Sequence, residues 1–312
     1  MFRLFRFLKP HTTAIVAVLI LIFLQSLANL YLPNLMSRIV DTGIIKGDIP
    51  YILEVGAWMI LVTVAGAMCS VLASFLASRV SADFGKTLRR QVFTHVENFT
   101  LHEFDEIGTA SLVTRTTNDI TQVQQLVNMM LRMMVMAPMM SIGGIIMAVI
   151  TDAKLSIIIA VIIPILSLII YAVLRKGMHL FRAMQAKIDT LNRILRENLA
   201  GIRVVRSFNR VEYEKNRFDF ANRDLADTAI RVNKMMATLW PTTTLVMNFS
   251  TIAVLWFGSI RINNLDMQVG SLMAFLQYIM QIMFAVMMVS MMLFMIPLAS
   301  ASASRIHQVL DM

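Results

Sequence analysis

Six long apolar runs alternate with polar segments along the 312-residue chain. Each run is close to or above the roughly 20 residues that a helix needs to cross the hydrocarbon core of a bilayer. The predicted spans are Thr13–Met36, Val55–Ser78, Met133–Ile150, Leu155–Leu174, Met235–Phe257 and Met267–Ser300. The pattern therefore predicts an all-α membrane protein with six transmembrane helices, over about residues 13–300.

The connections between these spans are of two kinds. Three are short, whereas about 54 residues separate spans two and three and about 60 separate spans four and five. Apolar residues recur at helical spacing within the long excursions, as at Val92, Val96 and Phe99. We expect spans two to five to continue as helical arms of ~25 residues, which reach nearly 40 Å at ~1.5 Å per residue. The arms would turn at two tips, around Phe104–Gly108 and Gly201–Glu212.

The first ten residues alternate cations with phenylalanine and leucine. Arg3, Arg6 and Lys9 repeat every three residues, as is typical of a short helix lying in the membrane interface. The apolar run that follows is longer than the ~7–15 residues of a signal-peptide core. We therefore expect an interfacial helix over about residues 1–10, followed by an uncleaved first span.

The composition agrees with a membrane protein. The chain is 57% hydrophobic and 15% charged, where a soluble domain would carry about 25% charge. Of its 28 lysines and arginines, 24 lie at the two ends and in the two long excursions. The positive-inside rule then places both termini and both excursions in the cytoplasm of a plasma-membrane protein. This topology accounts for the net charge of +9, and we expect no nucleic-acid partner.

The second tip is amphipathic if it is helical. Ile202, Val205 and Phe208 gather on one surface, and the arginines at 203, 206 and 210 fall on another. A two-faced segment at the end of a long arm can transmit a rigid-body displacement from a partner. The alternative is a solvated helix in a cytoplasmic loop, with no partner.

Four segments carry a family resemblance. Glu103–Ile120 resembles the Phe-Asp-x3-Gly-x-x-x-Ser/Thr-Arg-x-x-Asn-Asp-Val/Ile segment of type I (type IV fold) ABC exporters. Glu197–Glu212 is similar to that family's Glu-x-x-x-Gly-Ile-x-Val-Val-x-x-Phe-x-x-Glu run. Arg38–Asp41, after Pro33, and the terminal Ala299–Ile306 match its first-span exit and its domain exit. The resemblance covers essentially the whole chain and looks closest to bacterial multidrug exporters, including heterodimeric ones.

The resemblance implies that residues 1–312 form an ABC exporter transmembrane domain. Each excursion would end in a coupling helix that docks on a nucleotide-binding domain, and a second transmembrane half would complete a homo- or heterodimer. ATP and Mg²⁺ would act through attached or partner nucleotide-binding domains. The coupling residues that the resemblance implies are Phe104, Asp105, Gly108, Phe208, Asn209, Arg210 and Glu212.

The sequence lacks a phosphate-binding loop. Phe84–Thr87 contains the Gly-Lys-Thr end of such a loop, but Val80 stands where its first glycine is needed. We interpret this as a chance match on a helical arm. The nucleotide-binding domain is expected to be absent from this chain, which would have no catalytic, cofactor or metal site of its own. Enzymatic activity would belong to the assembled ATP-dependent translocase.

The spans contain neutral polar residues and no charged ones, with Arg132 at an edge. A proton-coupled transporter needs a titratable group in the membrane, so this pattern favours energy supplied from outside the membrane. Amide, aromatic and thioether side chains suit a cavity for varied hydrophobic or weakly cationic compounds. The predicted cavity residues are Gln25, Asn29, Asn248, Gln277, Gln281, Phe284, Met288 and Met291. The alternative is that they only pack helix against helix.

These observations predict the membrane-spanning half of an ATP-driven multidrug exporter that works by alternating access. A lipid or peptide exporter of the same fold is one alternative. Paired basic residues in the spans would favour lipid headgroups, and the sequence has none there. A membrane sensor or scaffold that docks a cytoplasmic partner is another, and the short outer loops argue against it.

Overall fold

The computed structural model describes residues 2–312, and it describes only the backbone of residues 2–5, Phe294, Pro297 and Leu298. The described residues are almost entirely helical and include no strand. They form two compact units, Met1–Ala160 with Ser250–Met312, and Val161–Phe249. The prediction of an all-α fold is confirmed.

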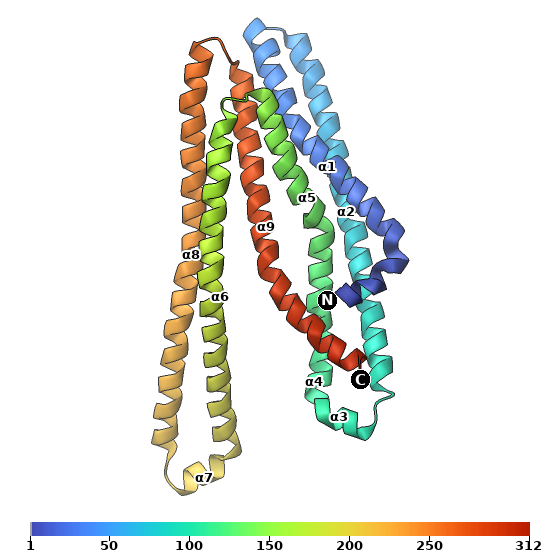
Figure 1. The fold of residues 1–312 in the computed structure, drawn as a ribbon, viewed down its shortest axis with the longest axis vertical. Coiled ribbons are helices and arrows are strands. Elements are labelled where there is room, and N and C mark those ends of the chain that lie inside the picture. Colours follow the sequence, from blue (N-terminus) through green and yellow to red (C-terminus); the bar gives the residue numbers. More distant parts are fainter. Residues whose placement is uncertain (1) are drawn as a thin grey trace. The chain divides into compact units, whose positions relative to one another are not determined.

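The first unit is a bundle built around four long helices. Helix α1 packs along α2, and α5 packs along α9 and also against α1 and α2. Figure 1 shows how short segments link these helices. The elements of the unit are η1 (Phe2–His11), α1 (Thr12–Arg38), η2 (Ile39–Ile44), α2 (Ile49–Val96), α3 (Leu101–Ile107), α4 (Thr109–Thr114), η3 (Arg115–Asp119), α5 (Ile120–Thr151) and α9 (Val269–Leu310), with the adjoining ends of α6 and α8.

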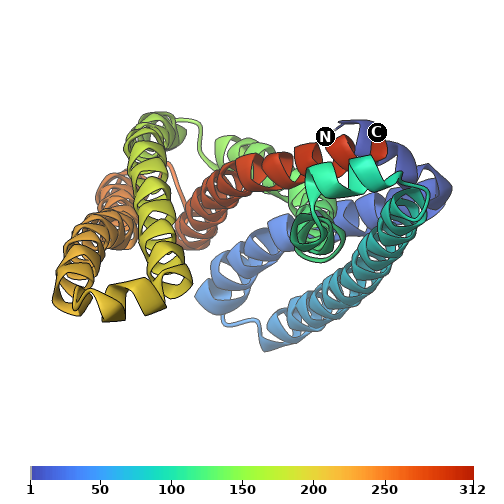
Figure 2. The ribbon, with the colours of Figure 1, turned by 90° about the horizontal axis from the view of Figure 1, so that it is seen from below.

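The second unit is a helical hairpin. It contains most of α6 (Ser156–Ala200) and α8 (Val211–Asn263), and Figure 2 shows the short α7 (Ile202–Ser207) joining them. Glu197 and Arg217 link the two long helices near the turn through an ion pair of 2.6 Å. A second ion pair, between Lys187 and Asp224, lies further along the hairpin.

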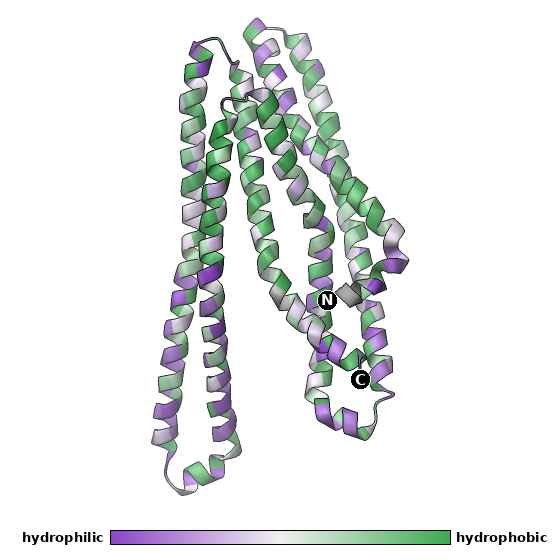
Figure 3. Cartoon of the chain, viewed as in Figure 1, coloured by the Kyte–Doolittle hydropathy of each residue, from purple (hydrophilic) through white to green (hydrophobic). Residues whose placement is uncertain are grey.

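Six helices are long and apolar enough to cross a membrane, as the sequence predicts. In the hairpin, Figure 3 shows the apolar residues gathered in the half of α6 and α8 away from α7, while the half next to α7 is polar. The long excursions are thus helical continuations of their spans. The candidate spans lie within Arg6–Ile44, Ile49–Val96, Thr109–Thr151, Ser156–Ala200, Val211–Asn263 and Val269–Leu293.

Both tips differ in detail from the predicted ones. Phe104 lies inside helix α3 rather than in a break, and the chain turns before α3 and at Gly108. In the second tip, the amphipathic helix is interrupted at Gly201 and again at Asn209, whose φ of 53° ends a right-handed helix. The predicted interfacial helix is a 3₁₀ helix, Phe2–His11, and the side chain of Arg3 lies outside the described residues.

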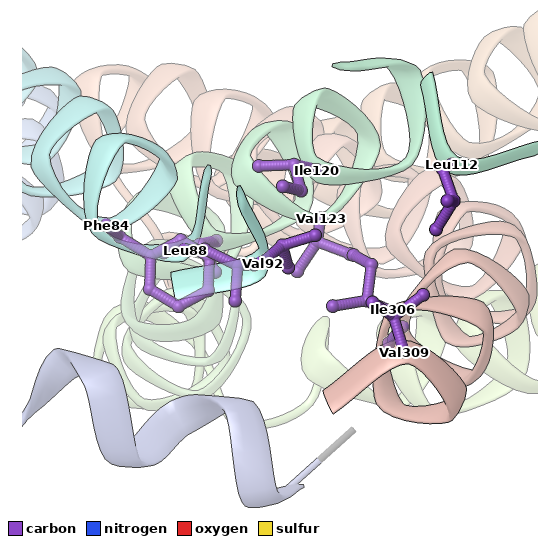
Figure 4. Close-up of a cluster of buried hydrophobic side chains, with 10 residues drawn as sticks. Phe84, Leu88, Val92, Leu112, Ile120, Val123, Ile306 and Val309 are labelled. Atoms are coloured by element: carbon purple, nitrogen blue, oxygen red, sulfur yellow. The ribbon is translucent and has the colours of Figure 1, made fainter. Parts of the chain in front are cut away.

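The tip end of the first unit, the end that carries α3 and α4, has its own apolar core. Figure 4 shows Leu88 of α2, Val123 of α5 and Ile306 of α9 among the side chains of this cluster. Each of the three is fully buried. Since burying one such side chain contributes about 1.5–3 kcal/mol, this cluster holds the first tip and the end of α9 together. The Phe84–Thr87 segment lies within helix α2, with Phe84 in the same cluster, so it is not a phosphate-binding loop.

At the opposite end of the first unit, the carboxylate of Asp41 connects α1 and η2 to the start of α9. Asp41, in the π-helical turn η2, accepts a hydrogen bond from the backbone amide of Gly270 at 2.6 Å. Ser37 donates its hydroxyl to the other oxygen of Asp41 at 2.9 Å. Asp41 thereby satisfies a free amide at the start of α9 and complements the positive end of that helix.

Candidate functional site

The first tip is a short helix with a well-defined beginning. Glu103 accepts hydrogen bonds at 2.8 Å from both the backbone amide and the hydroxyl of Thr100. The hydroxyl of Thr100 in turn accepts from the Glu103 amide, which completes a capping box. The hydrogen bond from the Thr100 amide, followed by that from its hydroxyl, lowers the pKa of the Glu103 carboxyl.

The predicted coupling residues of this tip have different environments. Phe104 is half-buried and packs against the core cluster at the tip end. Asp105 is exposed. Gly108 ends α3 with a φ of 78°, a conformation that favours glycine, and its amide donates to the carbonyl of Phe104 at 3.0 Å. The aromatic side chain of the first tip therefore contacts its own chain.

The second tip presents its aromatic side chain to solvent. Phe208 is 73% exposed. Asn209 adopts the left-handed conformation, which asparagine tolerates better than most residues, and the Arg210 amide donates to the carbonyl of Val205 at 2.9 Å. The side chains of Arg210 and Glu212 are exposed, and Glu212 pairs with Lys215 at 3.6 Å.

Phe208 is one of several exposed apolar residues around the turn. The apolar residues exposed around the turn, here called the tip patch, are Leu199, Val204, Phe208, Val211 and Tyr213. Each is at least half exposed. A group of exposed apolar residues beside charged ones is typical of a protein interaction site.

The first tip is also tied to the end of α9 by a polar network. Asp119, buried at the end of the π-helical turn η3, accepts hydrogen bonds from Ser302 at 2.9 Å and from Arg305 Nε at 2.7 Å. The hydrogen bond to Asp119 raises the pKa of the Arg305 guanidinium. Arg115 closes the network by donating to the carbonyl oxygen of Arg305 at 3.0 Å. Two of the segments that carry the family resemblance are thus in direct contact.

A cavity of about 450 Å³, here called the main cavity, lies between α1, α2, α5 and α9. Two predicted residues line it, Gln25 and Met288. Its other polar lining includes Gln124, Gln125 and Asn128 of α5, with serines of α2. Arg132 is the charged residue of this lining, and none of the described residues that line it is acidic or aromatic.

Three other predicted residues line a separate hollow of about 370 Å³ on α9. They are Gln277, Gln281 and Phe284, joined there by Met280 and Thr251. The amide nitrogen of Gln281 donates to the backbone carbonyl of Asn29 at 3.1 Å, so this glutamine also links α9 to α1.

The remaining predicted cavity residues lie elsewhere. The side chain of Asn29 lines neither the main cavity nor the α9 hollow, and Met291 is exposed outside both. Asn248 is an exposed residue of the second unit. Within the first unit, the predicted residues are therefore divided between the main cavity and the α9 hollow, with Asn29 and Met291 in neither.

Sequence reasoning missed the residues of α5 that line the main cavity. Gln124, Asn128 and Arg132 recur every four residues and so share one face of a helix. This stripe is visible in the sequence, but it lies just before the predicted third span and was assigned to an arm. Tyr278 was missed as well. It is fully buried, and its hydroxyl donates to the carbonyl of Leu30 at 3.2 Å.

Residues 15–286 match the family model of the ABC transporter transmembrane region. The chain belongs to this family, and it is a multi-pass membrane protein with the six helices that such a domain requires. This confirms the resemblance to ABC exporter transmembrane domains.

Curated bacterial proteins extend the comparison. The chain is 41% identical, over 97% of its length, to an uncharacterized ABC transporter ATP-binding protein of Mycobacterium tuberculosis, of which it covers 52%. It is 35% identical, over 98% of its length, to the uncharacterized ABC transporter ATP-binding protein YfiB of Bacillus subtilis, of which it covers 53%. It is also 21% identical, over 83% of its length, to an ATP-dependent lipid A-core flippase of Vibrio parahaemolyticus, of which it covers 44%. The chain thus spans about half the length of these relatives.

Proposed function

We propose that this chain is the membrane half of an ATP-driven exporter and that the tip patch docks on an ATP-binding domain. Binding of ATP and Mg²⁺ by such domains, attached or in partner chains, brings them together. The two tips carry this displacement to the spans, and the main cavity switches between the two sides of the plasma membrane. The substrates are hydrophobic and amphiphilic compounds, as in multidrug efflux.

The exposure of Phe208 carries this proposal. Phe208 is 73% exposed at the end of a polar arm, so its ring contributes little hydrophobic stabilisation to the isolated chain. A docking groove that buries it would gain most of its contact energy from this one aromatic residue. The ion pair between Glu197 and Arg217 connects the two long helices just behind the turn, so both helices are joined close to Phe208.

The proposed function also requires a second membrane half. Two membrane halves are needed to enclose a substrate pathway, so the exporter is a homo- or heterodimer of such domains. Both termini and both tips lie in the cytoplasm, where ATP is available, in agreement with the distribution of lysines and arginines. The names of the relatives, which are ATP-binding proteins about twice as long as the matched part, support an attached ATP-binding domain.

A lipid exporter of the same fold is the second candidate. Arg132 on the wall of the main cavity favours it, because an arginine can bind the headgroup of an anionic lipid. The lipid A-core flippase of Vibrio parahaemolyticus is a relative with a named lipid substrate.

The coupling proposal is tested with Phe208→Ala and Arg210→Ala in the assembled transporter in vesicles. Phe208→Ala should leave basal ATP hydrolysis measurable but abolish its stimulation by substrate, together with transport. Arg210→Ala, a neighbouring exposed side chain of the turn, should retain most of both activities because rim charges contribute less. A substrate-stimulated, transporting Phe208→Ala protein would show that the tip is merely solvated.

A further inference from the structure

We propose that the main cavity takes amphiphiles that carry an anionic group, and that the Arg132 guanidinium recognises the anion. The inference rests on the proposed function, since it names the substrate class of the same cavity. It replaces the expectation of weakly cationic compounds, which was based on the neutral polar residues of the spans.

The first argument is that Arg132 is a charge without a counter-charge. In the part of the chain that the structure describes, no acidic side chain pairs with Arg132 or lines the cavity beside it. Two other arginines of this unit, Arg261 and Arg305, do have acidic partners, in Asp152 and Asp119. A guanidinium remains protonated and presents a planar fork of donors that matches a carboxylate or a phosphate. A cation without a partner beside an apolar span is accordingly a candidate ligand site.

The second argument is that two neighbouring polar groups on α5, those of Asn128 and Gln124, already have hydrogen-bond partners. The amide of Asn128 donates to the hydroxyls of Ser78 and Ser81, at 3.4 and 3.2 Å. The side-chain oxygen of Gln124 accepts from Arg89 at 3.2 Å. These hydrogen bonds fix the wall of the cavity and leave Arg132 as its strongest available donor.

The third argument is the apolar surface next to this charge. Met133 and Met136 follow Arg132 on α5, and Met288 completes this part of the lining from α9. Methionine side chains adapt to hydrocarbon groups of different shapes. Arg132 comes directly before the predicted third span, so the anionic group would lie at the edge of the membrane with its tail among the methionines.

The lining also argues against cationic compounds. Proteins hold organic cations with carboxylates or with aromatic faces, and the described lining contains neither. A cation in this cavity would instead meet the positive charge of Arg132. The cavity therefore discriminates by the sign of the ligand's charge.

Binding of three matched fluorescent probes to the purified full chain in phosphatidylcholine nanodiscs tests this inference. The probes are 11-(dansylamino)undecanoic acid, its methyl ester and the corresponding trimethylammonium compound, which share one tail and differ in charge. We expect the acid to bind at least tenfold more tightly than the other two. Equal binding of acid and ester would overturn the proposal.

Variants locate the binding site. Arg132→Gln should weaken binding of the acid about tenfold and leave binding of the ester unchanged. The affinity of Arg132→Lys for the acid should lie between those of the wild type and Arg132→Gln, because lysine keeps the charge but lacks the planar fork of donors. Arg79→Gln removes an exposed cation of α2 that lies outside the cavity lining, and it should have no effect. If Arg132→Gln and Arg79→Gln weaken the acid equally, the selectivity comes from overall charge, and the proposal is wrong.

A further measurement, with anionic lipid in the nanodisc, distinguishes a lipid headgroup from a free amphiphile as the source of the anionic group. If anionic lipid is the ligand, replacing a fifth of the phosphatidylcholine with phosphatidylglycerol should weaken acid binding to the wild-type chain but leave the residual binding of Arg132→Gln unchanged. If the ligand is a free amphiphile, this replacement should not change binding by the wild-type chain. These measurements need no ATP, so they succeed or fail independently of the coupling test at Phe208.

Discussion

Arg305 donates a hydrogen bond from Nε to Oδ2 of Asp119 across 2.7 Å, although the two residues are 186 positions apart in the chain. A second nitrogen of the same guanidinium reaches Oδ1, which also accepts from Ser302. The Asp119 side chain is buried, whereas that of Arg305 is about half exposed. The pair links the segment that follows the first tip to the end of the last helix.

Replacing Arg305 should destabilise the first unit. Arg305→Ala leaves the buried Asp119 carboxylate without its main partner, and we expect the free energy of unfolding to fall by about 1–3 kcal/mol. Thermal unfolding of the purified chain, followed by tryptophan fluorescence, measures this as a lower Tm. Arg90→Ala removes an exposed arginine of α2 and should stay within about 0.5 kcal/mol of wild type. Equal stability of the two variants would contradict the role of the ion pair.

The contact between α9 and α1 at the opposite end of the first unit should depend on the absence of a side chain at Gly270. A Cβ there would lie 2.5 Å from the backbone oxygen of Ser37 and 2.7 Å from Oδ2 of Asp41. We expect Gly270→Ala to cost about 1–3 kcal/mol, because a backbone atom cannot move aside as a flexible side chain can.

Gly56→Ala is the matched control for Gly270→Ala. A Cβ at Gly56 meets nothing within 4 Å, so this variant should be as stable as wild type or up to about 1 kcal/mol more stable through helix propensity. Tm values of both variants in the same detergent make the comparison. A Gly270→Ala protein as stable as Gly56→Ala would show that the end of α1 and the start of α9 can move apart without a loss of stability.

Replacing the phenylalanine of the first tip should lower stability, whereas replacing that of the second tip should not. Phe104→Ala removes a half-buried side chain from the core cluster, and we expect a loss of about 1–3 kcal/mol, below the ~3–5 kcal/mol typical of a fully buried phenylalanine. Phe208→Ala removes an exposed side chain and should change stability by less than about 0.5 kcal/mol. The Tm values of the two purified variants, compared with that of the wild type, test this prediction. A large loss in Phe208→Ala would mean that this residue supports the hairpin itself.

Phe284 offers a test of the hollow on α9. It is half exposed there, beside Gln277 and Gln281. We expect Phe284→Ala, and also Gln281→Ala, to change which compounds the assembled transporter exports while assembly stays intact. Met291→Ala, an exposed residue of the same helix outside the hollow, is the control. An unchanged substrate profile in vesicles for Phe284→Ala and Gln281→Ala would identify these two positions as packing residues.

Secondary structure and membrane character were predictable because both depend on local pattern. An apolar run of about 20 residues predicts a span wherever it occurs, and helical spacing predicts an arm. The same local information located Gly108 and Gly201 at the tips. It did not predict that Phe104 would be covered and Phe208 exposed, because that difference depends on whether residues distant in sequence pack against each ring.

The sequence by itself determined the family, the six spans and the polar arms, since order and spacing along one chain suffice for each. Only the tertiary structure decided which helix faces meet. It brought Asp119 to Arg305, and it placed Gln25, Arg132 and Met288 on one cavity while leaving Met291 outside. The physical reason is that packing depends on how helices cross and rotate, and this is set by the sum of many distant contacts rather than by any local pattern.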